Sequence, residues 1–95
     1  MDRFCALSSL RSMRVLDRNG EFVGRIGDVL LDVRDGRIEY VCIHLDSTVC
    51  ASPSEAIVPW STLSMTHSTN ARWRVSAGKA VLMDIAQPAS AAEHL

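Results

Sequence analysis

The chain of 95 residues has almost no net charge and few aromatic side chains. It contains 10 basic and 11 acidic residues, and aromatic residues make up 5% of it. A formal net charge of −1 gives no field that would attract nucleic acid or an anionic membrane surface. Surfaces that stack the bases of single strands also need aromatic rings beside basic residues. We therefore expect no nucleic-acid partner.

Paired cysteines and long apolar runs are lacking as well. The three cysteines, Cys5, Cys42 and Cys50, form no C-x-x-C motif and are odd in number, which disfavours a disulfide framework and favours a reducing compartment. No charge-free apolar run approaches the roughly 20 residues of a membrane span. Near the N-terminus, Arg11 interrupts a short apolar patch, which is not typical of a signal peptide. The sequence predicts a cytoplasmic protein without membrane insertion.

The sequence does contain turn motifs between runs of branched apolar residues. Asn19-Gly20 and Asp35-Gly36 each separate two such runs. Asn, Asp and Gly tolerate the positive φ angles that a tight hairpin turn requires. An EF-hand calcium loop does not fit, because the glycine comes too early and the flanking residues are typical of strands. Both motifs are predicted to be hairpin turns.

The turns delimit a series of short strands. Gly24 and Gly27 interrupt the second apolar run, which indicates a β-bulge or a bend. Pro59 is predicted to end a later strand, because proline has no N–H to donate, and a single helical turn follows with Trp60 and Leu63 packed inward. No segment of helical period is long enough for a crossover, which excludes a parallel α/β fold. Strands are predicted for residues 13–16, 22–33, 37–46, 55–59, 72–76 and 79–85.

These segments predict an all-β fold, a small antiparallel β-barrel of five or six strands with one short helical turn. A small sheet of this kind must curl or close to hide its edges. One domain is expected over residues 1–95, with its core at about 10–85 and an alanine-rich tail at 87–95 that is frayed or a short helix. The predicted core residues are Val15, Val23, Ile26, Val29, Leu31, Val41, Ile43, Ile57, Trp60, Leu63, Trp73, Val75, Val81 and Met83.

Residues 15–41 and 56–63 together resemble the PRC-barrel family. The first segment has a strand, an Asx-Gly turn and then the pattern G-x-[IV]-x-D-[IVL]-[LM]-x-D, which runs here from Gly24 to Asp32. The second segment contains V-P-W-x-x-L, here Val58 to Leu63. The resemblance covers about residues 10–85. It departs from the family pattern at Ser12, where glycine is common before the first strand.

The PRC-barrel family takes its name from the cytoplasmic domain of the photosynthetic reaction centre H subunit. It also includes the C-terminal domain of the ribosome maturation factor RimM. The resemblance implies a small β-barrel that acts as an assembly or docking module and not as a catalyst. Two other functions stay open: an RNA- or ribosome-associated factor by analogy with RimM, and a sensor that binds a small ligand or a metal.

Cys42 and His44 alternate along one predicted strand and so point to the same face. With Cys50 nearby they suggest a metal site, but a structural zinc site requires four ligands, and no fourth candidate has ligand spacing. The favoured interpretation is a packed cysteine beside a partly exposed histidine, with no cofactor. No enzyme activity is predicted, because the sequence has no G-x-S-x-G elbow that would position a nucleophile.

The strand predicted at residues 37–46 is apolar on both faces, whereas a half-solvated strand alternates apolar and polar residues. A single-layer barrel can bury only one of these faces in its own interior. We therefore predict a homodimer that buries the face carrying Tyr40. If the chain is a monomer, that face is expected to bind a different protein. The predicted interaction residues are Ile38, Tyr40 and Cys42, while Val41, Ile43 and Leu45 line the opposite face.

Overall fold

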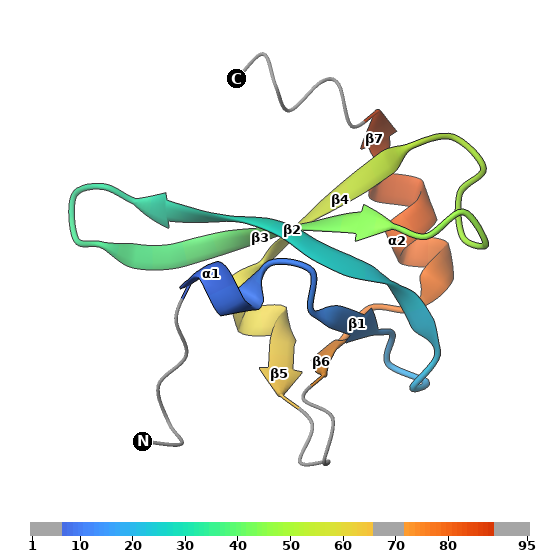
Figure 1. The fold of residues 1–95 in the computed structure, drawn as a ribbon, viewed down its shortest axis with the longest axis horizontal. Coiled ribbons are helices and arrows are strands. Elements are labelled where there is room, and N and C mark those ends of the chain that lie inside the picture. Colours follow the sequence, from blue (N-terminus) through green and yellow to red (C-terminus); the bar gives the residue numbers. More distant parts are fainter. Residues whose placement is uncertain (1–6, 66–71, 89–95) are drawn as a thin grey trace.

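The computed structural model describes residues 7–65 and 72–88, which form one strongly curled sheet with two short helices (Figure 1). This confirms the β-rich fold that the sequence predicts. The elements in chain order are α1 (Leu7–Leu10), β1 (Arg14–Leu16), β2 (Phe22–Asp32), β3 (Arg37–Leu45), β4 (Ser54–Pro59), the 3-10 turn η1 (Trp60–Thr62), β5 (Leu63–Met65), β6 (Trp73–Val75), α2 (Lys79–Ile85) and β7 (Gln87–Pro88).

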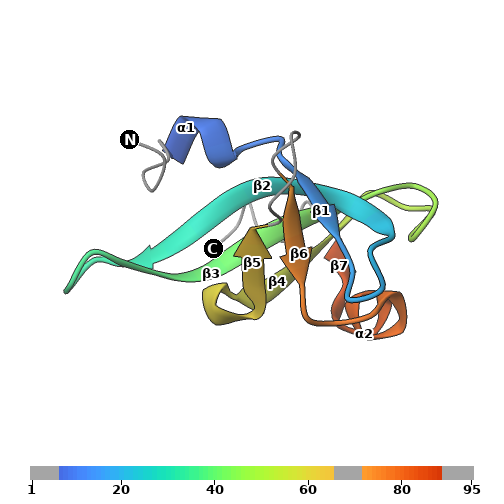
Figure 2. The same cartoon turned by 90° about the horizontal axis from the view of Figure 1, so that it is seen from below.

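In the described residues the sheet has seven strands in the order β5-β6-β1-β2-β3-β4-β7. Its neighbouring strands are antiparallel except β1 and β6, where Val15 pairs with Trp73 in the parallel sense. In Figure 2 the curl is seen from below, with α1 above β2 and α2 at the lower edge of the molecule. No helix in the described residues is long and apolar enough to cross a membrane.

Local side-chain chemistry shapes the turn between β1 and β2. Asp17 is 1% exposed, and its Oδ1 accepts hydrogen bonds of 2.9 Å from the backbone N–H groups of Asn19 and Glu21. Gly20 takes a φ of +83°, a conformation that side chains with a Cβ rarely adopt. At the turn after β2, Gly36 has a φ of +73°, so glycine is favoured there as well.

Two register shifts bend β2 against β3, one between Ile26 and Asp28 and one between Leu30 and Leu31. Gly27 lies in the first shift, as expected for a glycine at a bulge. Gly24 lies in regular pairing opposite Leu45, where an added Cβ would collide with the His44 carbonyl group. A Cβ would therefore meet backbone atoms at position 24 but the movable His44 ring at position 27.

The core lies inside the curl of the sheet. Six of the fourteen predicted core residues are there, while Val29, Trp60, Leu63 and Trp73 are partly buried against it. Ile57 is half-buried. The buried apolar cluster consists of Val15, Val23, Ile26, Val41, Ile43, Leu45, Val49, Ala56, Val58, Val75 and Leu82.

The prediction of a strand at residues 79–85 was wrong, because this segment forms α2. Val81 and Met83 were expected in the core but are each 53% exposed, and Leu82 between them is fully buried. A helix of this length turns Leu82 inward, and the continuous apolar run at residues 80–83 suits a short helix as well as a strand. Leu31 was also expected in the core and is 44% exposed.

Other differences concern short elements. β5 and β7 were not predicted, so the sheet has more strands than the five or six expected. The parallel pairing of β1 with β6 departs from the purely antiparallel prediction. Of the tail predicted at 87–95, Gln87 and Pro88 form β7, and residues 89–95 lie outside the described residues. Cys5 also lies outside them.

Candidate functional site

The β2–β3 hairpin projects far beyond the rest of the sheet (Figure 1). Its outer half, residues 29–40, is called the arm below. β1 pairs with β2 only as far as Arg25, and β4 pairs with β3 only from Tyr40 onward. Among the described residues, the two strands of the arm are therefore paired with each other and with no further strand beyond Tyr40. In the described part of the chain their outer edges pair with no strand, and such edges present N–H and C=O groups to a further strand.

The arm also carries exposed apolar side chains. Leu30 and Leu31 are 41% and 44% exposed, Tyr40 is 48% exposed and Val33 is 89% exposed. These are half of the exposed large apolar side chains in the described part of the chain. Leu30 pairs with Tyr40 across the hairpin, so these two side chains lie on the same face. An apolar patch on an unpaired hairpin is a typical interaction surface.

The charges of the arm alternate in sign. Arg34 binds Asp32 through a contact of 2.8 Å, and Arg37 lies 4.0 Å from Asp35. Hydrogen bonds from the side chain and backbone of Arg34 hold the pKa of Asp32 below its ordinary value. The tip of the arm therefore has no strong field of one sign.

A shallow cavity of about 290 Å³ lies at the base of the arm between Tyr40 and Trp60. Pro59 ends β4 here, as predicted, and Trp60 begins the 3-10 turn. The Trp60 ring packs against the Trp73 ring, with ring centroids 5.2 Å apart. This cavity extends the apolar patch from the arm onto the body of the domain.

The three predicted interaction residues do not lie together on the surface. Tyr40 is exposed and Ile38 is half-buried, but Cys42 is only 4% exposed. Cys42 follows Tyr40 on the same face of β3, at the point where the body of the sheet begins. The surface therefore consists of the arm residues without Cys42.

Cys42 instead belongs to a polar cluster with His44 and Glu55. The Cys42 thiol donates a hydrogen bond of 2.8 Å to Glu55 Oε2, and His44 Nε2 lies 3.4 Å from the same oxygen. Glu55 is 2% exposed, whereas the His44 side chain is 59% exposed. Burial, the hydrogen bond to Glu55 and the negative charges of Glu55 and Asp28 together raise the pKa of the Cys42 thiol to about 12.

Cys50 is not part of this cluster. Cys50 lies in the loop before β4, and its sulfur is 3.2 Å from the hydroxyl of Ser54, the first residue of β4. Glu55 takes the third position because it pairs directly with His44 across β3 and β4. The sequence did not predict that Glu55 belongs to this cluster, because its distance from His44 along the chain does not reveal that the two residues pair across β3 and β4. The available signal was an acidic residue directly before the apolar run Ala56–Val58.

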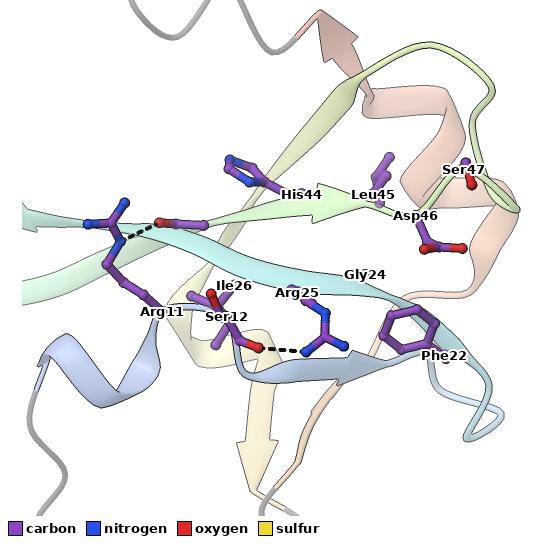
Figure 3. A pocket seen from close by; sticks show the side chains of 11 residues that line it. Arg11, Ser12, Phe22, Gly24, Arg25, Ile26, His44, Leu45, Asp46 and Ser47 are labelled. Carbon is purple, nitrogen blue, oxygen red and sulfur yellow. Dashed lines mark hydrogen bonds between the residues drawn. The ribbon is translucent and has the colours of Figure 1, made fainter.

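His44 also lines a second depression, of about 350 Å³, on the same side of the sheet as α1 (Figure 3). Two arginines close it: Arg11 donates a hydrogen bond of 3.2 Å to the Gly27 carbonyl, and Arg25 donates one of 2.9 Å to the Ser12 carbonyl. The Phe22 ring lies at the far end, with the Arg14 guanidinium 4.1 Å from its centroid. These arginines are engaged with backbone and ring, so they hold α1 and the edge of the sheet together.

The family model of the PRC-barrel domain matches residues 2–86, which is most of the chain. The chain belongs to the PRC-barrel domain family. The match agrees with the curled, β-rich fold and confirms the resemblance found in the sequence. A comparison with curated proteins found no match to this PRC-barrel chain. The family is thus established, while the partner and process have to be argued from the surface.

Proposed function

We propose that this PRC-barrel protein is a non-catalytic interaction module of the cytoplasm that assembles as a two-fold homodimer through its arm. The observation that supports the proposal is the apolar surface of the arm, formed by Leu30, Leu31, Val33 and Tyr40. Leu30 and Tyr40 lie on one face of the hairpin and Leu31 points to the other, so the arm exposes large apolar side chains on both faces, which favours a surface that binds a partner.

The unpaired edges of the arm favour a second copy as that partner. Two copies of one hairpin can meet edge to edge around a two-fold axis, because the same backbone groups are presented by both. Such pairing would satisfy the edge N–H and C=O groups of β2 or β3 and place apolar side chains of the two copies side by side on the same face. The pairing residues would be Val29–Asp32 or Arg37–Glu39.

Charge also suits self-association. The arm carries Asp32, Arg34, Asp35, Arg37 and Glu39, so positive and negative groups alternate along it. In a two-fold arrangement each arginine can face an acidic residue of the other copy. With a formal net charge of −1, two chains repel each other only weakly.

Burial of apolar surface can contribute substantially to the free energy of dimerisation. At about 25 cal/mol per Å², a few hundred Å² of apolar surface is worth several kcal/mol before the entropy of association is subtracted. The alternative of an RNA- or ribosome-associated factor has no comparable support, because the arginines at the second depression are engaged within the chain.

Sedimentation equilibrium over a range of protein concentrations tests the proposal. We expect a dimer for the unmodified protein and a folded monomer for Tyr40→Glu, with Val33→Asp at the fully exposed tip as a second variant. Val81→Glu is the matched control, because Val81 is as exposed as Tyr40 but lies on α2. A monomer at the highest concentration for the unmodified protein would contradict the homodimer, and capture of a different protein by the arm would then be the function to pursue.

A further inference from the structure

A buried carboxylate shared by a thiol and an imidazole stands out on the outer face of β3 and β4. Glu55 is 2% exposed, and its Oε2 is shared by the Cys42 thiol and the His44 imidazole. Its other oxygen, Oε1, is buried and has no hydrogen-bond partner in the described part of the chain. A buried carboxylate oxygen without a partner is costly, because it has lost its hydration. Such an atom indicates a missing partner.

The neighbouring groups are all ligands that transition metals accept. One ligand atom each from Cys42, His44 and Glu55 can be chosen so that all of them lie within 4.8 Å of one another. Around a tetrahedral Zn²⁺ with bonds of about 2.0–2.3 Å, neighbouring ligand atoms are roughly 3.3–3.8 Å apart. The 3.4 Å between His44 Nε2 and Glu55 Oε2 already has this value. The 2.8 Å between Cys42 Sγ and Glu55 Oε2 is the distance of two atoms that share a proton.

The backbone preorganises the cluster. Cys42 and His44 lie on the same face of β3, and Glu55 stands directly opposite His44 on β4. The His44 ring lies over Gly27, which has no side chain to push it away. Three ligands therefore come from two adjacent strands of regular sheet, and a site built on strands is held more firmly than one built on loops.

We propose that Cys42, His44 and Glu55 form a binding site for a divalent transition-metal ion of the Zn²⁺ type. Cys42 would bind through its sulfur after its proton passes to solvent, His44 through Nε2 and Glu55 through a carboxylate oxygen, leaving a fourth position open to water. One thiolate, one imidazole and one carboxylate favour Zn²⁺ and Co²⁺ over Mg²⁺ and Ca²⁺, which prefer oxygen ligands alone. All three ligands belong to one chain, so the site does not depend on the proposed dimer.

Titration with Co²⁺ tests the site directly, because a cysteine thiolate bound to Co²⁺ gives a charge-transfer absorption in the near ultraviolet. The protein should carry Cys5→Ser and Cys50→Ser, so that Cys42 is the remaining thiol, and should be kept reduced. We expect the absorption to saturate at one Co²⁺ per chain and to disappear when Zn²⁺ is added. The same titration on the Tyr40→Glu variant should give the same result.

Two substitutions assign the ligands in this background. Cys42→Ser should abolish the charge-transfer absorption. His44→Ala should weaken the apparent affinity for Co²⁺ at least about tenfold, the loss expected for one coordination bond worth 1.4 kcal/mol or more. His44 is well exposed, so its replacement should leave the circular dichroism spectrum unchanged even if the buried Cys42 variant folds poorly.

The control is Asp35→Asn. Asp35 belongs to an exposed acidic group with Asp32 and Glu39 on the arm, the second group of metal-binding side chains in the described residues. This variant should bind Co²⁺ as the parent does. Absence of saturable absorption, or an unchanged affinity in His44→Ala, would overturn the proposal, as would an affinity that falls with Asp35→Asn.

Discussion

The imidazole ring of His44 lies against the backbone of Gly27, so closely that no Cβ fits at position 27 without displacing the ring. Gly27 lies at a bulge of β2, and His44 lies on the neighbouring strand β3, where it pairs with Arg25. The contact links a backbone irregularity to the position of a side chain beside the buried Glu55.

Gly27→Ala is the first prediction. The colliding atoms belong to the end of an exposed side chain, and the backbone of Gly27 is acceptable for alanine, so the ring should swing away at little cost. We expect the free energy of unfolding to fall by less than about 1 kcal/mol, within the usual range for a tolerated substitution. The contact of His44 with Glu55 should be lost. Chemical denaturation checks the stability, and the histidine NMR shifts report the movement; an unmoved His44 would contradict the prediction.

Gly24→Ala provides the contrasting case, three residues earlier on the same strand. Here the added Cβ would collide with backbone atoms of His44 and Leu45, which cannot rotate away. The pairing of β2 with β3 would have to separate locally, and overpacking of this kind costs about 1–3 kcal/mol. We expect Gly24→Ala to be clearly less stable than Gly27→Ala in the same urea titration. Equal stability of the two variants would show that β2 can shift as a whole.

Ser12→Gly should stabilise the protein. Ser12 has a φ of +70° while its N–H donates a hydrogen bond of 2.7 Å to the Ile26 carbonyl. Relief of the left-handed strain is worth about 1–2 kcal/mol, and the greater freedom of glycine in the unfolded chain offsets part of it. A net gain of about 0.5–1 kcal/mol is expected from these two effects. Ser12→Val, with its branched Cβ, should lower the melting temperature; a stabilising valine would rule out backbone strain at this position.

Asp17→Ala should be destabilising through the first turn. The carboxylate accepts two backbone hydrogen bonds and is almost fully buried, so alanine leaves two N–H groups without their partner. We expect a loss of about 2–3 kcal/mol, about 1–1.5 kcal/mol for each hydrogen bond. The comparison is Asp35→Ala in the exposed turn of the arm, where the Arg37 backbone N–H donates to the carboxylate. We expect this variant to lower the free energy of unfolding by at most about 1 kcal/mol. Thermal unfolding followed by circular dichroism measures both.

Cys42 should resist alkylation in the folded protein. Its sulfur is buried, and its pKa is raised to about 12, so very little reactive thiolate exists at neutral pH. Iodoacetamide followed by peptide mass spectrometry should leave Cys42 unmodified in buffer and modify it fully in denaturant. Rapid labelling of Cys42 without denaturant would show that the cluster with Glu55 opens easily.

The hairpin turns and most of the core could be predicted because they depend on local rules. Asn19-Gly20 and Asp35-Gly36 specify their turns through backbone conformations that few residues adopt. The burial of Val41, Ile43 and Leu45 on one face of β3 follows from the strand period. Val81 and Met83 lie in a continuous apolar run, where the choice between strand and helix depends on Leu82 fitting the core, which is a tertiary effect.

The polar cluster could be predicted only in part. The spacing of Cys42 and His44 places them on one face of a strand, which the sequence shows directly. The presence of Glu55 beside them depends on the register of β3 against β4, and a loop separates these strands. The register of two strands cannot be predicted from local sequence rules when a loop of this length joins them. For the same reason, the position of Cys50 was misjudged.

The pairing of β1 with β6 has a consequence for how the chain folds. β1 to β4 are neighbours in sequence and can form as successive hairpins, whereas β6 must return to the free edge of β1. The Trp73 indole N–H donates to the Met13 sulfur over 3.1 Å, joining positions 60 residues apart. Closing a long loop slows folding, because its entropy is lost before the distant contacts form. During synthesis, the edge of β1 that β6 covers therefore stays open until residues 73–75 have emerged. In this interval the nascent domain is most exposed to pairing with the wrong strand.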